Sequence, residues 1–71
     1  MNTLIFRTNI NTQNDFALVR SELEKRFSIK ESTIDLEDRD KVLRVITKHV
    51  QPQTIANEVK RLDYFCEELE D

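Results

Sequence analysis

The chain of 71 residues divides into six segments, and the spacing of apolar residues changes from each segment to the next. Alternating apolar and polar residues predict a strand, and apolar residues three or four positions apart predict a helix. The predicted strands are Thr3–Ile10, Ile29–Glu37, Lys41–Val50 and Tyr64–Leu69, and the predicted helices are Asn14–Arg26 and Gln51–Leu62. A chain of this length forms one domain, residues 1–71, so all six elements must share a single core.

The same patterns predict which side chains share the inner faces. The positions are Leu4, Phe6, Thr8 and Ile10 in the first strand, Phe16, Val19, Leu23 and Phe27 in the first helix, Ser32, Ile34, Leu36, Leu43 and Val45 in the middle strands, and Ile55, Ala56, Val59 and Leu62 in the second helix. Leu18 lies opposite the apolar stripe of the first helix, so we expect it to be exposed.

The order of the elements is β-α-β-β-α-β. With right-handed crossovers, this order predicts an α+β ferredoxin-like sandwich, in which a four-stranded antiparallel sheet carries both helices on one face. The first strand then lies between the third and fourth strands. The other face of the sheet is left open to solvent or to a partner.

The chain contains no Gly. This excludes the phosphate-binding loops that need Gly where the backbone approaches a nucleotide. Helices often end at a residue in the left-handed conformation, which is usually Gly. We therefore expect Phe27-Ser28 to serve at the end of the first helix and Asp63 at the end of the second, since Asp tolerates this conformation better than most residues.

Charge and composition restrict the partners. Eleven Lys and Arg stand against fourteen Asp and Glu, a net charge of −3 without a basic cluster, so we expect no nucleic-acid partner. No segment is apolar enough to enter a membrane, and the first residues lack the pattern of a signal peptide. The single Cys66 excludes an internal disulfide framework and agrees with the cytoplasmic location that we expect.

The chain resembles the heavy-metal-associated domains of copper chaperones and metal-transporting ATPases over nearly its whole length. The stretches that carry the resemblance are Ile34-Asp35-Leu36, Lys41-Val42-Leu43-Arg44-Val45, and Val50-Gln51-Pro52 leading through Ile55 and Val59 to Tyr64. Members of this family end the second helix with Lys-x-x-Gly-Tyr. This chain has Arg61-Leu62-Asp63-Tyr64 there, with Asp63 in place of the Gly.

The resemblance implies a metal loop after the first strand, where the family carries Cys-x-x-Cys. Here Thr12 and Asp15 stand at the positions of the two cysteines. A hydroxyl and a carboxylate are hard oxygen donors, whereas Cu(I) prefers soft thiolates. We therefore expect no metal and no cofactor in this loop. In the structural interpretation, Thr12 or Asn14 caps the first helix and Asp15 complements the helix dipole.

The remaining side chains that are able to act as metal ligands or catalytic groups are isolated from one another in the sequence. Cys66 is expected to be a buried, inert thiol. His49 is the sole imidazole and is expected to be solvated near the end of a strand. The resemblance places Tyr64 near the first loop, where we expect it to pack. Because no catalytic constellation emerges, we expect no enzymatic activity.

An apolar excess on the open face of the predicted sheet is a candidate interface. It consists of Ile5, Ile46 and Phe65, with Val42 on the same side, and is flanked by Arg7, Arg44 and Lys48. It predicts self-association or a protein partner, against the alternative that scattered surface apolar residues are normal.

The leading hypothesis is a small non-enzymatic domain with a degenerate metal loop that serves as a protein-interaction or regulatory module. The predicted partner-binding residues are Thr12, Gln13, Asn14, Asp15, Leu18 and Tyr64 at the loop, and Ile5, Ile46 and Phe65 on the sheet. The alternative is a heavy-metal binding or transport protein that uses non-standard ligands such as Cys66 and His49, or ligands from a partner. A third possibility, a ligand-sensing domain with the same element order, fits less well because such domains often use Gly-rich turns.

Overall fold

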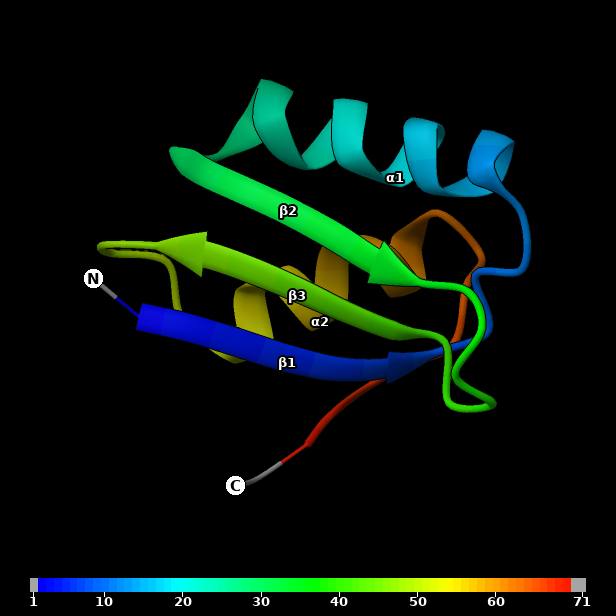
Figure 1. The fold of residues 1–71 in the computed structure, drawn as a ribbon. Coiled ribbons are helices and arrows are strands. Elements are labelled where there is room, and N and C mark those ends of the chain that lie inside the picture. The colour runs from blue at the N-terminus through cyan, green and yellow to red at the C-terminus, as the bar shows by residue number, and fades with distance from the viewer. Residues whose placement is uncertain (1, 70–71) are drawn as a thin grey trace.

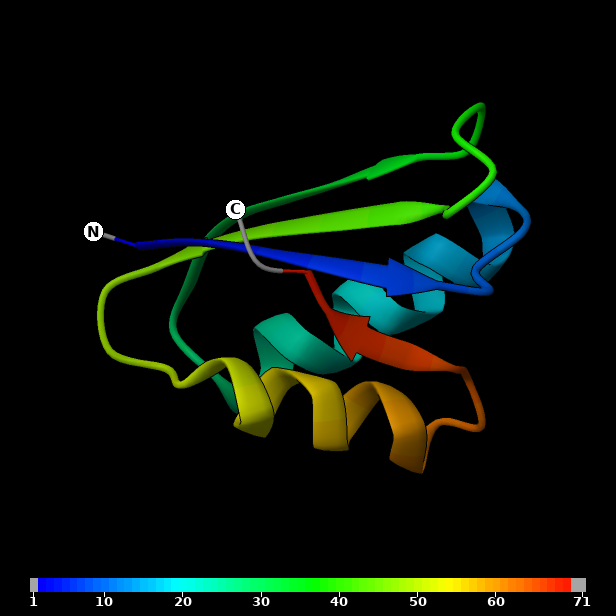
Figure 2. The ribbon, with the colours of Figure 1, turned by 90° about the horizontal axis from the view of Figure 1, so that it is seen from below.

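The computed structural model describes residues 2–69, which form a four-stranded sheet with both helices on one face (Figures 1 and 2). The elements are β1 (Asn2–Thr8), α1 (Gln13–Arg26), β2 (Ile29–Asp35), β3 (Val42–Thr47), α2 (Pro52–Arg61) and β4 (Cys66–Glu68). All neighbouring strands are antiparallel, in the order β2-β3-β1-β4. The predicted ferredoxin-like sandwich is confirmed, as is the place of β1 between β3 and β4.

The strands are shorter than the sequence predicted, because side chains redirect the backbone at their ends. Beyond β1, the Ile10 N–H donates to the Thr8 hydroxyl at 3.2 Å instead of to a strand. Beyond β2, the Asp35 carboxylate accepts from the N–H groups of Glu37 and Asp38, at 3.1 and 3.2 Å, and this bends the chain into the hairpin turn. Leu36 therefore lies outside the strand in which we predicted it.

The other two strands are shortened for similar reasons. Lys41 has a φ of 46°, in the left-handed region, so β3 begins only at Val42. The N–H of Phe65 donates to the Asn9 side chain at 2.9 Å, and β4 begins at the next residue. Glu67 and Glu68 lie in β4, paired with Arg7 and Phe6 of β1, whereas Glu70 and Asp71 lie outside the described residues.

The core lies between the sheet and the helices and matches the predicted pattern closely. Its buried apolar side chains are Leu4, Phe6, Ile10, Phe16, Val19, Leu23, Leu43, Val45, Ile55, Ala56, Val59 and Cys66. Phe27 and Leu62, predicted in the buried helix stripes, are only partly buried and pack at the margin of this cluster. Ile10 is fully buried although it lies after β1, so it anchors the loop that follows.

An ion cluster joins the two helices on the side away from the sheet. The Glu58 side chain on α2 is only 9% exposed and lies 2.6 Å from Arg61 and 3.0 Å from Arg26 of α1. Glu22 of α1 completes the cluster at 3.4 Å from Arg61. The hydrogen bond from Arg61 lowers the pKa of Glu58, so its ionised form stabilises the fold, and this contribution is lost as the pH falls through the lowered pKa.

The end of α2 confirms the expected role of Asp63, which has a φ of 73°. The Tyr64 N–H donates to the Val59 carbonyl at 3.3 Å, and the Asp63 N–H donates to the Lys60 carbonyl at 2.9 Å. These two bonds form the Schellman motif that usually requires Gly at the left-handed position. The turn therefore forms without Gly, at the expense of some strain at Asp63.

The end of α1 differs from the expectation. Phe27 has a φ of −133° and an extended backbone, and its N–H donates to the Leu23 carbonyl at 2.9 Å. The predicted left-handed role of Phe27-Ser28 is wrong because the chain passes directly into β2 at Ile29, leaving no turn that would need it.

Replacing Asp63 by Gly should raise the free energy of unfolding by about 0.5–1 kcal/mol. Gly removes the left-handed penalty of a Cβ atom, which exceeds the extra freedom that Gly gives the unfolded chain. Asp63→Ala is the control and should lower stability, because Ala keeps the Cβ but lacks the local hydrogen bonding that helps Asp. Urea unfolding of the three proteins measures the difference. A Gly variant less stable than the wild type would contradict the assignment.

Candidate functional site

Three loops meet at one end of the molecule, around the segment between β1 and α1 (Figure 1). The Thr8 hydroxyl donates to the Lys41 carbonyl at 2.6 Å, and the Thr8 N–H donates to the Asp40 carbonyl at 3.0 Å. These bonds attach the β2–β3 hairpin to the end of β1. With Ile10 buried beside them, the start of the β1–α1 loop is held in place by the protein itself.

Thr12 is the N-cap residue of α1. Its backbone is extended, with φ −136° and ψ 161°, and its hydroxyl oxygen accepts from the Asp15 N–H at 3.0 Å. The Thr12 carbonyl accepts the first helical bond, from Phe16, at 3.0 Å. The capping role predicted for Thr12 is confirmed, and one lone-pair direction of its hydroxyl is already used by the backbone.

Asp15 lies in the first turn of α1 and is half-buried, and its side chain faces the opposite loop. The Tyr64 hydroxyl donates to Asp15 Oδ1 at 2.9 Å, across 49 positions of the sequence. Desolvation and this hydrogen bond raise the pKa of Tyr64, so the phenol stays protonated as the donor. The expected contact between Tyr64 and the first loop is confirmed.

A second hydrogen bond joins the same two loops. The Asn9 Oδ1 atom accepts from the Phe65 N–H at 2.9 Å. Asn9 was not among the predicted site residues, because a single exposed Asn after a strand gives no signal of a partner 56 positions away. Together the two bonds close the β1–α1 loop against the segment between α2 and β4.

One oxygen atom at each of the two loop positions already accepts a hydrogen bond within the protein. The Thr12 hydroxyl caps the helix, and the Asp15 carboxylate accepts from Tyr64. Both are hard donors, which suit ions such as Mg²⁺ or Ca²⁺ far better than Cu(I). Over residues 2–69, no three His, Cys, Asp or Glu side chains come together as a metal-binding group.

The surface around the closed loop contains one large apolar side chain. Leu18 is 50% exposed, as expected, and lies one helical turn after Asn14. Gln13 and Asn14 are exposed in the first turn of the same helix, and Tyr64 is half-buried. The structure therefore gathers the six predicted loop residues at one end of the molecule.

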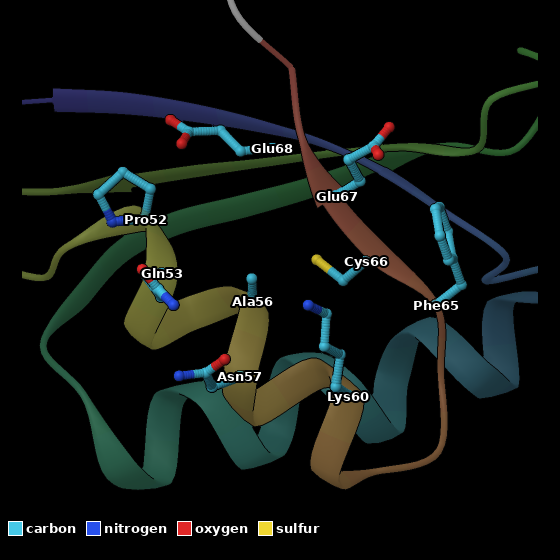
Figure 3. A pocket seen from close by; sticks show the side chains of 9 residues that line it. All are labelled: Pro52, Gln53, Ala56, Asn57, Lys60, Phe65, Cys66, Glu67 and Glu68. Atoms are coloured by element: carbon cyan, nitrogen blue, oxygen red, sulfur yellow. The ribbon is translucent and has the colours of Figure 1, made fainter.

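Cys66 forms the floor of a shallow groove of about 320 Å³ between α2 and β4 (Figure 3). The residue is 2% exposed, and desolvation raises the pKa of its thiol to about 11, which neighbouring Lys60 offsets only in part. The prediction of a buried thiol is confirmed. The groove is open and rimmed by polar side chains such as Gln53 and Asn57.

His49 is exposed in the connection between β3 and α2. Figure 1 shows that the end of β3 and the β1–α1 loop lie at opposite ends of the sheet. His49 therefore cannot join Thr12 and Asp15 in a common site.

The open sheet face is less apolar at its surface than the sequence suggested. Ile5 and Ile46 are on this face but half-buried, and only Phe65 is well exposed, at 46%. Phe65 also precedes β4 instead of lying in it. The Arg7 guanidinium lies 5.8 Å from the centre of the Phe65 ring and forms a 2.6 Å ion pair with Glu67. Arg7 thus covers part of the predicted patch.

Comparison with known proteins identifies the fold. No protein-family model matches the chain, and no curated protein matches it. Among solved structures, it is similar to the yeast copper transporter domain CCC2A, which was determined in the apo and Cu(I)-loaded states. The TM-score is 0.85 at 15% sequence identity, over 100% of this chain and 99% of that chain. The chain therefore has the fold expected from its resemblance to heavy-metal-associated domains. Neither helix among the described residues is long and apolar enough to cross a membrane.

The Cys66 thiol should react with iodoacetamide at about pH 8 at least about a hundredfold more slowly in the folded protein than in urea, because a raised pKa leaves little thiolate. Burial slows the reaction further. Mass spectrometry over time measures the rate. Equal rates in the folded and unfolded protein would show an accessible thiol and contradict the structure.

Proposed function

We propose that this chain is a heavy-metal-associated-like domain without enzymatic activity, which acts as a protein-interaction module through its β1–α1 loop. The hydrogen bond from Tyr64 to Asp15 carries the proposal, because it commits a metal-loop position to a contact within the protein. The interaction is proposed to be independent of metal. The overall likeness to a copper transporter domain supports the family relation at the level of fold.

The chemistry of the loop supports the loss of Cu(I) binding. A soft ion would compete with the backbone N–H at the Thr12 hydroxyl and with the phenol at the Asp15 carboxylate, and would gain only two hard oxygen ligands. The closed loop is also stable without any ion, since its cap, its buried Ile10 and its two cross-loop hydrogen bonds come from the chain itself.

The exposed surface next to the loop supports docking of a protein. Leu18 offers an exposed apolar contact, and exposed Asn14, one helical turn before it, offers a donor and an acceptor beside it. An apolar centre with a polar rim is the usual composition of a protein interface. The same end of the domain includes Thr12, Asp15 and Tyr64, so a partner would recognise the closed loop.

A second candidate, metal handling with non-standard ligands, is supported by the copper transporter domain among the similar structures. Within this chain it would need Cys66, which is buried, or His49, which lies at the far end of the sheet. This candidate therefore depends on metal ligands that a partner supplies.

Cu(I) titration against a coloured chelator under reducing conditions separates the two candidates. The wild type and Cys66→Ser should leave Cu(I) with the chelator, whereas Thr12→Cys/Asp15→Cys should take up one ion, because it restores two thiolates at the start of a helix. Tight stoichiometric binding by the wild type, with NMR shifts confined to residues 12–16, would overturn the leading proposal.

Site-specific photo-crosslinking in cells that express the protein tests the docking surface. A crosslinking residue at Leu18 should give a discrete protein adduct, and one at Gln53, which is also exposed but lies on α2, should not. Excess wild-type domain should compete with the adduct, and excess Leu18→Asp domain should not. Equal adducts from both positions, or equal competition by both domains, would contradict docking at the loop.

A further inference from the structure

The outer edge of the sheet at β2 is not paired with another strand among the described residues. β2 pairs only with β3, and α1 lies along β2 on the helix-covered face (Figures 1 and 2). A free edge offers backbone donors and acceptors to any further strand. The direction of these groups decides which residues are available.

Hydrogen bonds in the interior of the sheet fix this direction. The Leu69 N–H donates to the Ile5 carbonyl at 2.8 Å, so the backbone groups of Ile5 point from β1 toward β4. Because these groups alternate along a strand, those of Phe6 point toward β3. Its register partner there is Leu43, whose groups therefore point back toward β1.

The same alternation continues to the edge. Arg44 follows Leu43, so its groups point toward β2 and bond Thr33, its register partner. Ser32 and Ile34 flank Thr33, and their N–H and C=O groups therefore point outward. Two consecutive outward positions provide the start of a further antiparallel ladder.

The centre of this edge also contains a polar atom without a partner. The Ser32 hydroxyl is buried, in a residue only 6% exposed, and makes no hydrogen bond. An unpaired buried hydroxyl is unfavourable, by about 1–3 kcal/mol in typical proteins. A group beside Ser32 across the edge would give it a partner after rotation about its Cα–Cβ bond.

We propose that β2 is a self-association edge, where β2 of a second copy of this chain adds antiparallel about a two-fold axis at Ser32. Charge favours this register over an axis one residue to either side, and the unpaired Ser32 hydroxyl favours it over an axis at Ile34, which would place Leu36 opposite Ser32. An axis at Thr33 would place Glu31 directly opposite Asp35 of the second copy, and an axis at Glu31 would oppose the two Glu31 side chains. Like charges directly opposite destabilise a strand pair.

With the axis at Ser32, no like charges are directly opposed. Glu31 faces Thr33 of the second copy, Lys30 faces Ile34, and the two Ser32 hydroxyls face each other. The two Ser32 residues exchange both backbone bonds across the axis. The irregularity between Ile29 and Glu31 limits the regular ladder to the centre of the strand.

The helix above β2 has a charge pattern that is compatible with this partner. The flank of α1 that faces α2 carries Glu22 and Arg26. The other flank carries Arg20 and Glu24, an exposed i,i+4 ion pair at 3.3 Å. A two-fold axis makes α1 of the second copy antiparallel, so this flank, with one positive and one negative side chain, faces the same flank of the other copy.

Charge substitutions at Thr33 test both the edge and the register. Thr33 is exposed, and in this register Thr33 of each copy lies opposite Glu31 of the other copy. Each substitution therefore acts at two equivalent places in the dimer. Thr33→Lys should lower the dissociation constant of the dimer about tenfold, and Thr33→Glu should raise it about tenfold. Sedimentation equilibrium from micromolar to millimolar loading measures both, with circular dichroism to confirm that each variant is folded.

The outcomes separate this edge from other surfaces and from the proposed docking at the loop. Opposite effects of Lys and Glu support a register in which Thr33 lies opposite an acidic residue, as it does with the axis at Ser32. Equal weakening by both variants would overturn it, since an axis at Thr33 opposes identical charges. A wild type that stays monomeric at millimolar loading, or a dimer that ignores both variants but is lost in Ile46→Glu, would overturn the β2 edge. None of these results depends on a partner at Leu18.

Discussion

The hydrogen bond from the Tyr64 hydroxyl to the Asp15 carboxylate joins two segments that lie 49 positions apart, and the closed form of the candidate site depends on it. It holds the first turn of α1 against the segment that follows α2. With the Asn9 bond to Phe65, it closes the β1–α1 loop from the side. A loop closed in this way needs no metal ion to become ordered.

Backbone strain at two positions makes this closure possible in a chain without Gly. Asp63 adopts the left-handed conformation, so the chain reverses after α2 and brings Tyr64 toward Asp15. Lys41 adopts it at the end of the hairpin, where its carbonyl accepts from Thr8 at the start of the loop. Both strained residues therefore lie in the loops that surround the site, as strain in folded proteins often does.

The fold could be predicted from the sequence because alternation and helical spacing report burial directly. Most predicted core residues are buried, and the others, which are Phe27, Ile34, Leu36 and Leu62, are partly buried against the core. The ends of the strands could not be predicted, because each depends on one side chain, such as Asp35 or Asn9, that bonds a particular N–H group. The cap at Thr12 was predictable from local rules. The bonds of Asn9 and the cluster around Glu58 required knowledge of which distant segments meet.

The likeness to a copper transporter domain extends over the whole chain, yet it describes the backbone and leaves the loop chemistry to the residues of this chain. In this chain, Thr12 caps α1 and Asp15 accepts a hydrogen bond from Tyr64, so both residues have structural roles in the loop. Interaction through the loop then requires only that its shape be fixed, which agrees with the general advantage of a preorganised surface in binding.

The order of the β1–α1 loop in the metal-free protein tests this account most directly. Amide ¹⁵N relaxation should give residues 9–15 order parameters of about 0.85, the same as in α1, with no change when Cu(I) is added. A loop that is markedly more mobile than α1, and that becomes rigid only with Cu(I), would contradict the account.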